Sequence, residues 1–168
     1  HETERYGEHS KGGEFVYDHP FQWGSKRTGP DLHRVGGKYP HLWHVRHMEE
    51  PASMTQGSVM PPHDFLLEDD LRVDLIEAKM RALRRVGVPY TDGEIETARA
   101  RSSTQAEVIA DEVEGQRGPT GLADKEIIAL TAYLQRLGTD IQWRAKAAAP
   151  LVVPEPGPEP RPRAGEVE

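Results

Sequence analysis

Cysteine is absent from the 168 residues of this chain, which excludes a disulfide framework, a thiolate zinc site and a cysteine nucleophile. Long apolar runs are lacking as well, since no stretch approaches the roughly 18 residues of a membrane-spanning helix. Basic charge is in the minority, with 21 basic against 28 acidic residues and a net charge of -7. This balance excludes the basic footprint that a nucleic-acid-binding protein needs.

Glycine and proline are abundant, with 16 and 14 residues, and they divide the chain into three regions. Residues 1–66 hold all eight histidines and show poor periodicity, which predicts mostly loop with a short helix over residues 41–48. Residues 67–144 have helical patterns. Residues 145–168 are rich in Pro, Glu and Arg, which predicts a disordered tail. We therefore expect one domain over 1–144 and a tail over 145–168.

Three helices are predicted in the second region. Apolar residues over 71–86 recur with a helical period, and Gly87 is placed to end that helix. Thr91 begins a capping-box pattern. The polar stretch 94–114 predicts a solvated helix, broken near Ser102 and Ser103.

The last helix is predicted from Asp124, a cap or first-turn residue, to Gly138. Its apolar face comprises Ile127, Leu130, Thr131, Leu134 and Leu137.

The histidines suggest a metal site. Three of them, His41, His44 and His47, are spaced at i, i+3 and i+6, so a helix brings at most two together. Three methionines, Met48, Met54 and Met60, could add thioethers, which suit Cu(I). The alternative is a set of ordinary imidazoles on a surface or in a cleft.

No catalytic motif accompanies these residues: the sequence has no nucleophile elbow, recognised triad or phosphate-binding loop. The most unusual segment is FQWGSKRTGPDLHRVGGKYPHLWH. It sets Trp23, Pro30 and Leu32 among three cations, Lys26, Arg27 and Arg34. This mixture suits a flat apolar ligand with an anionic edge, such as haem. The alternative is a surface loop that buries its tryptophan.

The order of three features is typical of class I cytochromes c. GPDL is followed about thirty residues later by Met60 in SVMPP, and later by an amphipathic helix, EIIALTAYLQRLG. A methionine sulfur favours ferrous haem and raises its potential.

The sequence ETERYGEHSKGGEFVYDHPFQWGSKRTGPDLHRVGGKY resembles the mono-haem cytochrome c subunit of cbb(3)-type cytochrome c oxidase (subunit II, FixO/CcoO). GSVMP, KMRALRRVGVPYTDGEI and IIALTAYLQRLGTD are similar to that family too, so the likeness covers residues 2 to about 140. The resemblance implies an all-α, loop-rich cytochrome c-like domain. It also implies a membrane-anchored subunit at the periplasmic face of the bacterial inner membrane. Such a subunit relays electrons from the di-haem subunit to the catalytic subunit, which reduces oxygen.

The resemblance also implies roles for individual residues. Met60 matches the distal axial ligand of the haem iron, and Gly29, Pro30 and Leu32 match a loop on the proximal side. Arg34 and Trp23 are expected at the haem edge. Ser25 is a weak candidate for a calcium ion at the interface with the catalytic subunit.

The family's CxxCH motif and membrane anchor would precede His1, so we expect a haem-bearing helix to be missing from this chain. In that case the last helix would present an uncovered face that includes Leu130, Tyr133, Leu134 and Leu137. Two other functions stay open: a periplasmic His/Met copper-binding protein, and a haem-free structural subunit of the oxidase.

Overall fold

The computed structural model describes residues 9–21, 23 and 29–139 of the chain. Its elements, in chain order, are η1 (Gly12–Phe15), α2 (His41–Glu49), α3 (Pro51–Met54), α4 (Phe65–Glu68), η2 (Val73–Leu75), α5 (Ile76–Arg85), α6 (Asp92–Gly115) and α7 (Glu126–Arg136). The described part is all-α and rich in loops, as the sequence predicts. Its only extended pairing is an isolated bridge between Asp70 and Lys125. The predicted tail lies outside the described residues.

The short helix expected over residues 41–48 is confirmed as α2. Pro40 precedes its first residue, where a missing N–H costs nothing, and Pro51 begins α3 directly after it. The loop that follows α3 returns to α2, since the N–H of His63 donates to the carbonyl of Met48 at 2.7 Å. The end of α2 therefore positions the far end of this loop, while its start is held by α3 through the bond from the Thr55 N–H to the Pro51 carbonyl.

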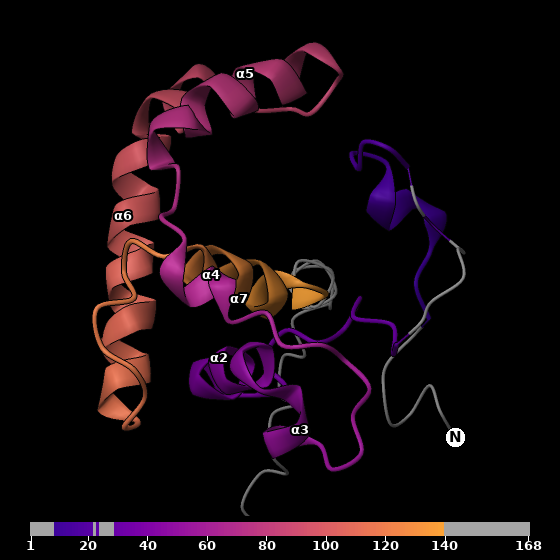
Figure 1. Cartoon of the computed structure of the whole chain (residues 1–168). Helices are drawn as coiled ribbons and strands as arrows, with labels where there is room; N and C mark the ends of the chain where they lie inside the picture. The colour runs from indigo at the N-terminus through magenta and orange to yellow at the C-terminus, as the bar shows by residue number, and fades with distance from the viewer. Residues whose placement is uncertain (1–8, 22, 24–28, 140–168) are drawn as a thin grey trace, which may run out of the picture.

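Helix α5 lies across the top of Figure 1, and α6, which contacts it, runs down the left side. Gly87, with a φ of 102°, turns the chain after α5, as the sequence predicts. The capping box at Thr91 is also confirmed, because its side chain accepts from the Glu94 N–H while the Glu94 carboxylate accepts from the Thr91 N–H. The predicted break near Ser102 is wrong. Helix α6 runs unbroken for 24 residues, since apolar side chains on both sides of the serines are buried against its neighbours.

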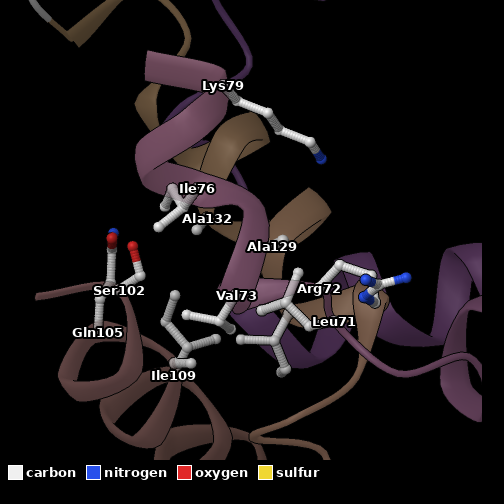
Figure 2. Close-up of a pocket in the computed structure, with 12 residues that line it drawn as sticks. Leu71, Arg72, Val73, Ile76, Lys79, Ser102, Gln105, Ile109, Ala129 and Ala132 are labelled. Atoms are coloured by element: carbon white, nitrogen blue, oxygen red, sulfur yellow. The ribbon is translucent and has the colours of Figure 1, made fainter. Parts of the chain in front are cut away.

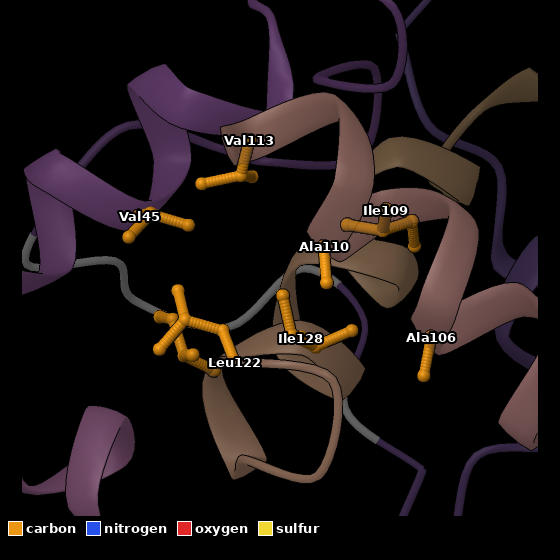
Figure 3. Packing of buried hydrophobic residues seen from close by; sticks show 8 residues of the cluster. Val45, Ala106, Ile109, Ala110, Val113, Leu122 and Ile128 are labelled. Atoms are coloured by element: carbon orange, nitrogen blue, oxygen red, sulfur yellow. The ribbon is translucent and has the colours of Figure 1, made fainter. Parts of the chain in front are cut away.

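The core lies where α2, α6 and α7 meet (Figure 3). Val45 of α2, Val113 of α6 and Ile127 of α7 are each fully buried. The buried cluster as a whole comprises Val45, Ala106, Ile109, Ala110, Val113, Leu122, Ile127 and Ile128. Helix α6 contributes small and β-branched residues at helical spacing, which lets α2 and α7 approach it closely.

Helix α7 starts at Glu126, with Lys125 rather than Asp124 in the cap position. The predicted uncovered face is wrong for Leu134, which is buried, while Leu130 and Leu137 are half-buried. Tyr133 alone of the four is exposed. The face is covered because α7 packs against α2, α4 and α6 of the same chain.

The segment 33–38 crosses the end of α7. The Gly36 N–H donates to the carbonyl of Leu137 at 3.0 Å, and a Cβ on Gly36 would lie 2.4 Å from the carbonyl oxygen of Gln135. The side chain of Gln135 accepts from the Gly37 N–H and donates to the carbonyl of Tyr39. Glycine at 36 is therefore required by close backbone contact, and Gln135 fixes the loop that leads into α2.

Candidate functional site

Large apolar side chains are exposed unevenly along the described chain. Eight of the twelve that are exposed belong to residues 16–65. They are Val16, Tyr17, Phe21, Trp23, Leu32, Tyr39, Val59 and Phe65, and we call them the N-terminal apolar set. Exposed apolar residues mark a surface that binds a ligand or another protein where they are contiguous, and this set is defined by its place in the sequence.

Met60 lies within this region, in the loop between α3 and α4, and is half-buried. Its N–H lies 3.3 Å from the hydroxyl of Ser58, and Val59 beside it is 96% exposed. Pro61 and Pro62 follow and restrict the backbone at this point. Met60 therefore has the setting expected of a loop ligand.

The other two methionines considered have different settings. Met48 packs against the core from α2, and Met54 is the last residue of α3.

The GPDL loop enters the described part of the chain at Gly29. Gly29, Pro30 and Leu32 are all exposed, and Leu32 belongs to the N-terminal apolar set. Asp31 accepts from the backbone N–H of His33 at 3.1 Å, which shapes the turn. The loop thus presents an apolar side chain from a constrained backbone.

Arg34 makes a two-pronged ion pair with Glu14. The two guanidinium nitrogens lie 2.9 Å and 3.0 Å from the carboxylate oxygens, and both side chains are largely buried. Burial alone would raise the pKa of Glu14, but hydrogen bonds from Arg34 and from the Lys11 N–H hold that pKa below its ordinary value. The charges of Arg34 and His33 act in the same direction.

This pair joins η1 to the GPDL loop across twenty residues of sequence, and sequence reasoning missed it because no local pattern connects the two positions. The Arg34 guanidinium already donates two hydrogen bonds to Glu14. The role of Arg34 at a haem edge stays a prediction.

Trp23 is 43% exposed, and its indole N–H donates to the hydroxyl of Ser10 at 3.3 Å. The ring also lies beside Gly12 of η1. Trp23 is therefore only partly covered, and the alternative of a loop built around a buried tryptophan does not describe it. Ser25, the calcium candidate, lies outside the described residues, as do Lys26 and Arg27.

The three histidines of α2 have different surroundings. His41 lies 3.3 Å from the Glu112 carboxylate and 3.1 Å from the Gln135 amide. His44 is 2% exposed, and its Nε2 has no hydrogen-bond partner among the described residues. Burial lowers the pKa of His44, and the charges of His41 and His47 lower it further. Within the described residues, no three His, Asp or Glu side chains are arranged to hold a metal ion.

His47 belongs instead to an aromatic stack that sequence reasoning missed. Tyr39 and Trp43 stack with ring centroids 3.9 Å apart, and Trp43 and His47 stack at 4.6 Å. The spacing of four residues between Trp43 and His47 is a signal that could have revealed their contact, because such residues are neighbours along a helix. Tyr39, which precedes α2, extends the stack and is also a member of the N-terminal apolar set.

A family model described as cytochrome c oxidase, mono-heme subunit/FixO, matches residues 1–141. The chain belongs to this family. No curated protein is similar enough to the chain to be matched. Membership makes the chain a relative of the mono-haem cytochrome c subunit of an oxidase, and haem c the cofactor that the family implies.

The described residues of this FixO-family chain suit one part of such a site. A thioether on a constrained loop and a set of exposed apolar side chains are the chemistry that a haem face requires. The thioether bonds of haem c require cysteines, and these 168 residues contain none. Among the described residues no helix is both long and apolar enough to cross a membrane.

Proposed function

We propose that this chain supplies the methionine side of the haem c site in an electron-transfer subunit of a cbb(3)-type oxidase. The observation that carries the proposal is the position of Met60, half-buried in a proline-bounded loop within the region that bears the N-terminal apolar set. When bound, the haem supplies a one-electron carrier.

In this proposal Met60 would hold the iron through its sulfur, and the neutral thioether would favour the reduced state. Pro30 and Leu32, with Gly29 before them, would pack against the apolar part of the haem. Trp23 would help to shield it from water. Arg34 orients the loop through its ion pair with Glu14, and its guanidinium would supply positive charge to an acidic haem edge.

The finer assignments belong to the same proposal. Electrons pass from the di-haem subunit through this subunit to the catalytic subunit, at the periplasmic face of the bacterial inner membrane. Residues 1–144 act as one domain. Calcium near the catalytic subunit stays a prediction from the family.

A direct test supplies a haem-bearing segment in trans. The full 168-residue chain is mixed with a haem c peptide that carries CxxCH and its histidine. We expect saturable binding and the sulfur-to-iron charge-transfer band of a ferric methionine-ligated haem. Met60→Leu should remove the charge-transfer band, although the haem peptide should still bind through apolar contacts. The matched Met54→Leu should leave the band unchanged.

Two results would contradict the proposal. A band that survives in Met60→Leu and disappears in Met54→Leu would move the ligand to Met54. Absence of any haem binding in the unmodified chain would favour the second candidate, a haem-free structural subunit. The His/Met copper protein receives no support from the divergent histidines of α2.

A further inference from the structure

A cavity of about 240 Å³ lies between η2, α5, α6 and α7, and Met60 is not among the residues that line it. Its lining is mostly apolar: Val73 and Ile76 come from η2 and α5, Ile109 from α6, and Ile128 and Ala132 from α7. Ile109 and Ile128 belong to the buried core. An apolar cavity of about 150 Å³ already binds a benzene ring, so this one has room for a larger apolar group.

Polar groups stand only at the rim of this cavity. Figure 2 shows Arg72 and Lys79 reaching out on one side, with Ser102 and Gln105 on the other. Lys79 is exposed and has no ion-pair partner among the described residues. The rim therefore offers cationic donors next to an apolar interior.

The charge at the rim is positive. Arg72 pairs with Asp74 at 2.9 Å. The charge of Arg99 on α6 also acts on that carboxylate. Arg72 and Arg99 thus act on the same acid, Asp74, and Lys79 adds a further positive charge to the rim. A ligand with a negative head is favoured there, and a cationic head is repelled.

We propose that this cavity binds a single unbranched apolar chain that ends in a carboxylate, with the chain inside and the head between Arg72 and Lys79. A methylene group takes about the space of a water molecule in the liquid, roughly 30 Å³, so about eight carbons fill the cavity. The proposal is independent of haem, because it uses none of the residues assigned to that site.

Octanoate is the probe, titrated calorimetrically into the full 168-residue chain. In a series from hexanoate to dodecanoate, each methylene that enters the cavity should tighten binding about fourfold, with no further gain beyond about eight carbons. Octanol and octyltrimethylammonium should bind more weakly than octanoate. Equal affinity for all three heads would overturn the role of the cations.

Two pairs of variants locate the site. Ala129 is exposed at the cavity, so Ala129→Phe should block the opening and abolish binding, while Ala82→Phe on the exposed side of α5 should not. Lys79→Gln should weaken the binding of octanoate two- to fivefold, because losing an exposed ion pair has an effect of that size. The matched Arg85→Gln on the same helix should have no effect. Unchanged binding in Ala129→Phe would refute the proposal.

A measurement on the unmodified chain does not depend on how the variants fold. Octanoate should shift the methyl resonances of Val73, Ile76 and Ile128 in carbon–proton spectra. Shifts confined to Leu32 and Val59 would place the ligand on the N-terminal apolar set and overturn the assignment to this cavity.

Discussion

Adding one methyl group at Gly36 should separate the GPDL loop from α7. In Gly36→Ala the new Cβ would lie 2.4 Å from the Gln135 carbonyl oxygen and 2.6 Å from that of Leu137. Both are backbone atoms, so the loop itself has to move. Overpacking costs about 1–3 kcal/mol. Loss of the Gly36 N–H bond to Leu137 adds about 0.5–1.5 kcal/mol, so we expect a loss of about 2–4 kcal/mol in the free energy of unfolding.

Urea denaturation of the full chain measures this loss. With a slope of about 2 kcal/mol per molar urea, the midpoint should fall by about 1–2 M. Gly37→Ala, at the position next to Gly36, is the matched control. Gly37 has a φ of 74° and open space around it, so this substitution should cost only the backbone strain of about 1–2 kcal/mol.

Gly93→Ala, in the first turn of α6 with no nearby atoms, should stabilise by up to about 1 kcal/mol. If Gly36→Ala lowers the midpoint no more than Gly37→Ala, the close contact with α7 does not constrain the loop.

Two further predictions concern pH. Because the folded pKa of Glu14 lies below its ordinary 4.5, its pair with Arg34 stabilises the fold above that pH and is lost as the pH falls further. Glu14→Gln should therefore cost about 1–3 kcal/mol at pH 7 and progressively less as the pH falls below 4.5; a cost that does not change with pH would contradict the ion pair. Burial lowers the pKa of His44 from 6.5, so the unfolded chain takes up a proton first and thermal stability should fall as the pH drops below 6.5. His44→Leu should flatten that pH dependence, measured by the melting temperature.

The parts of the fold that sequence reasoning predicted depend on neighbouring residues. The start of α2 after Pro40, the capping box at Thr91 and the turn at Gly87 each follow from chemistry within a few positions. The family was also identified, because long motifs such as YDHPFQWGSKRTGPDL carry it. Features that depend on residues a few positions apart can therefore be predicted from a single sequence.

The parts that were missed depend on contacts across the chain. The pair of Glu14 with Arg34 and the contacts of Gln135 leave no periodic signal. Ser102 suggested a break in α6 because serine is a weak helix former, yet packing of the helix on both sides outweighs that preference. The cavity beside Ile109 likewise exists only once four elements meet.

The contacts of Gln135 also set the earliest moment during synthesis at which the loop that leads into α2 can reach its final position. The amide accepts from Gly37, 98 residues earlier, and donates to Tyr39, 96 residues earlier. A ribosome adds about 5–20 residues per second, so about 5–20 s separate the synthesis of the two partners. Through that interval the loop has no Gln135 to hold it. It can take its final position only after every helix of the described chain has been translated.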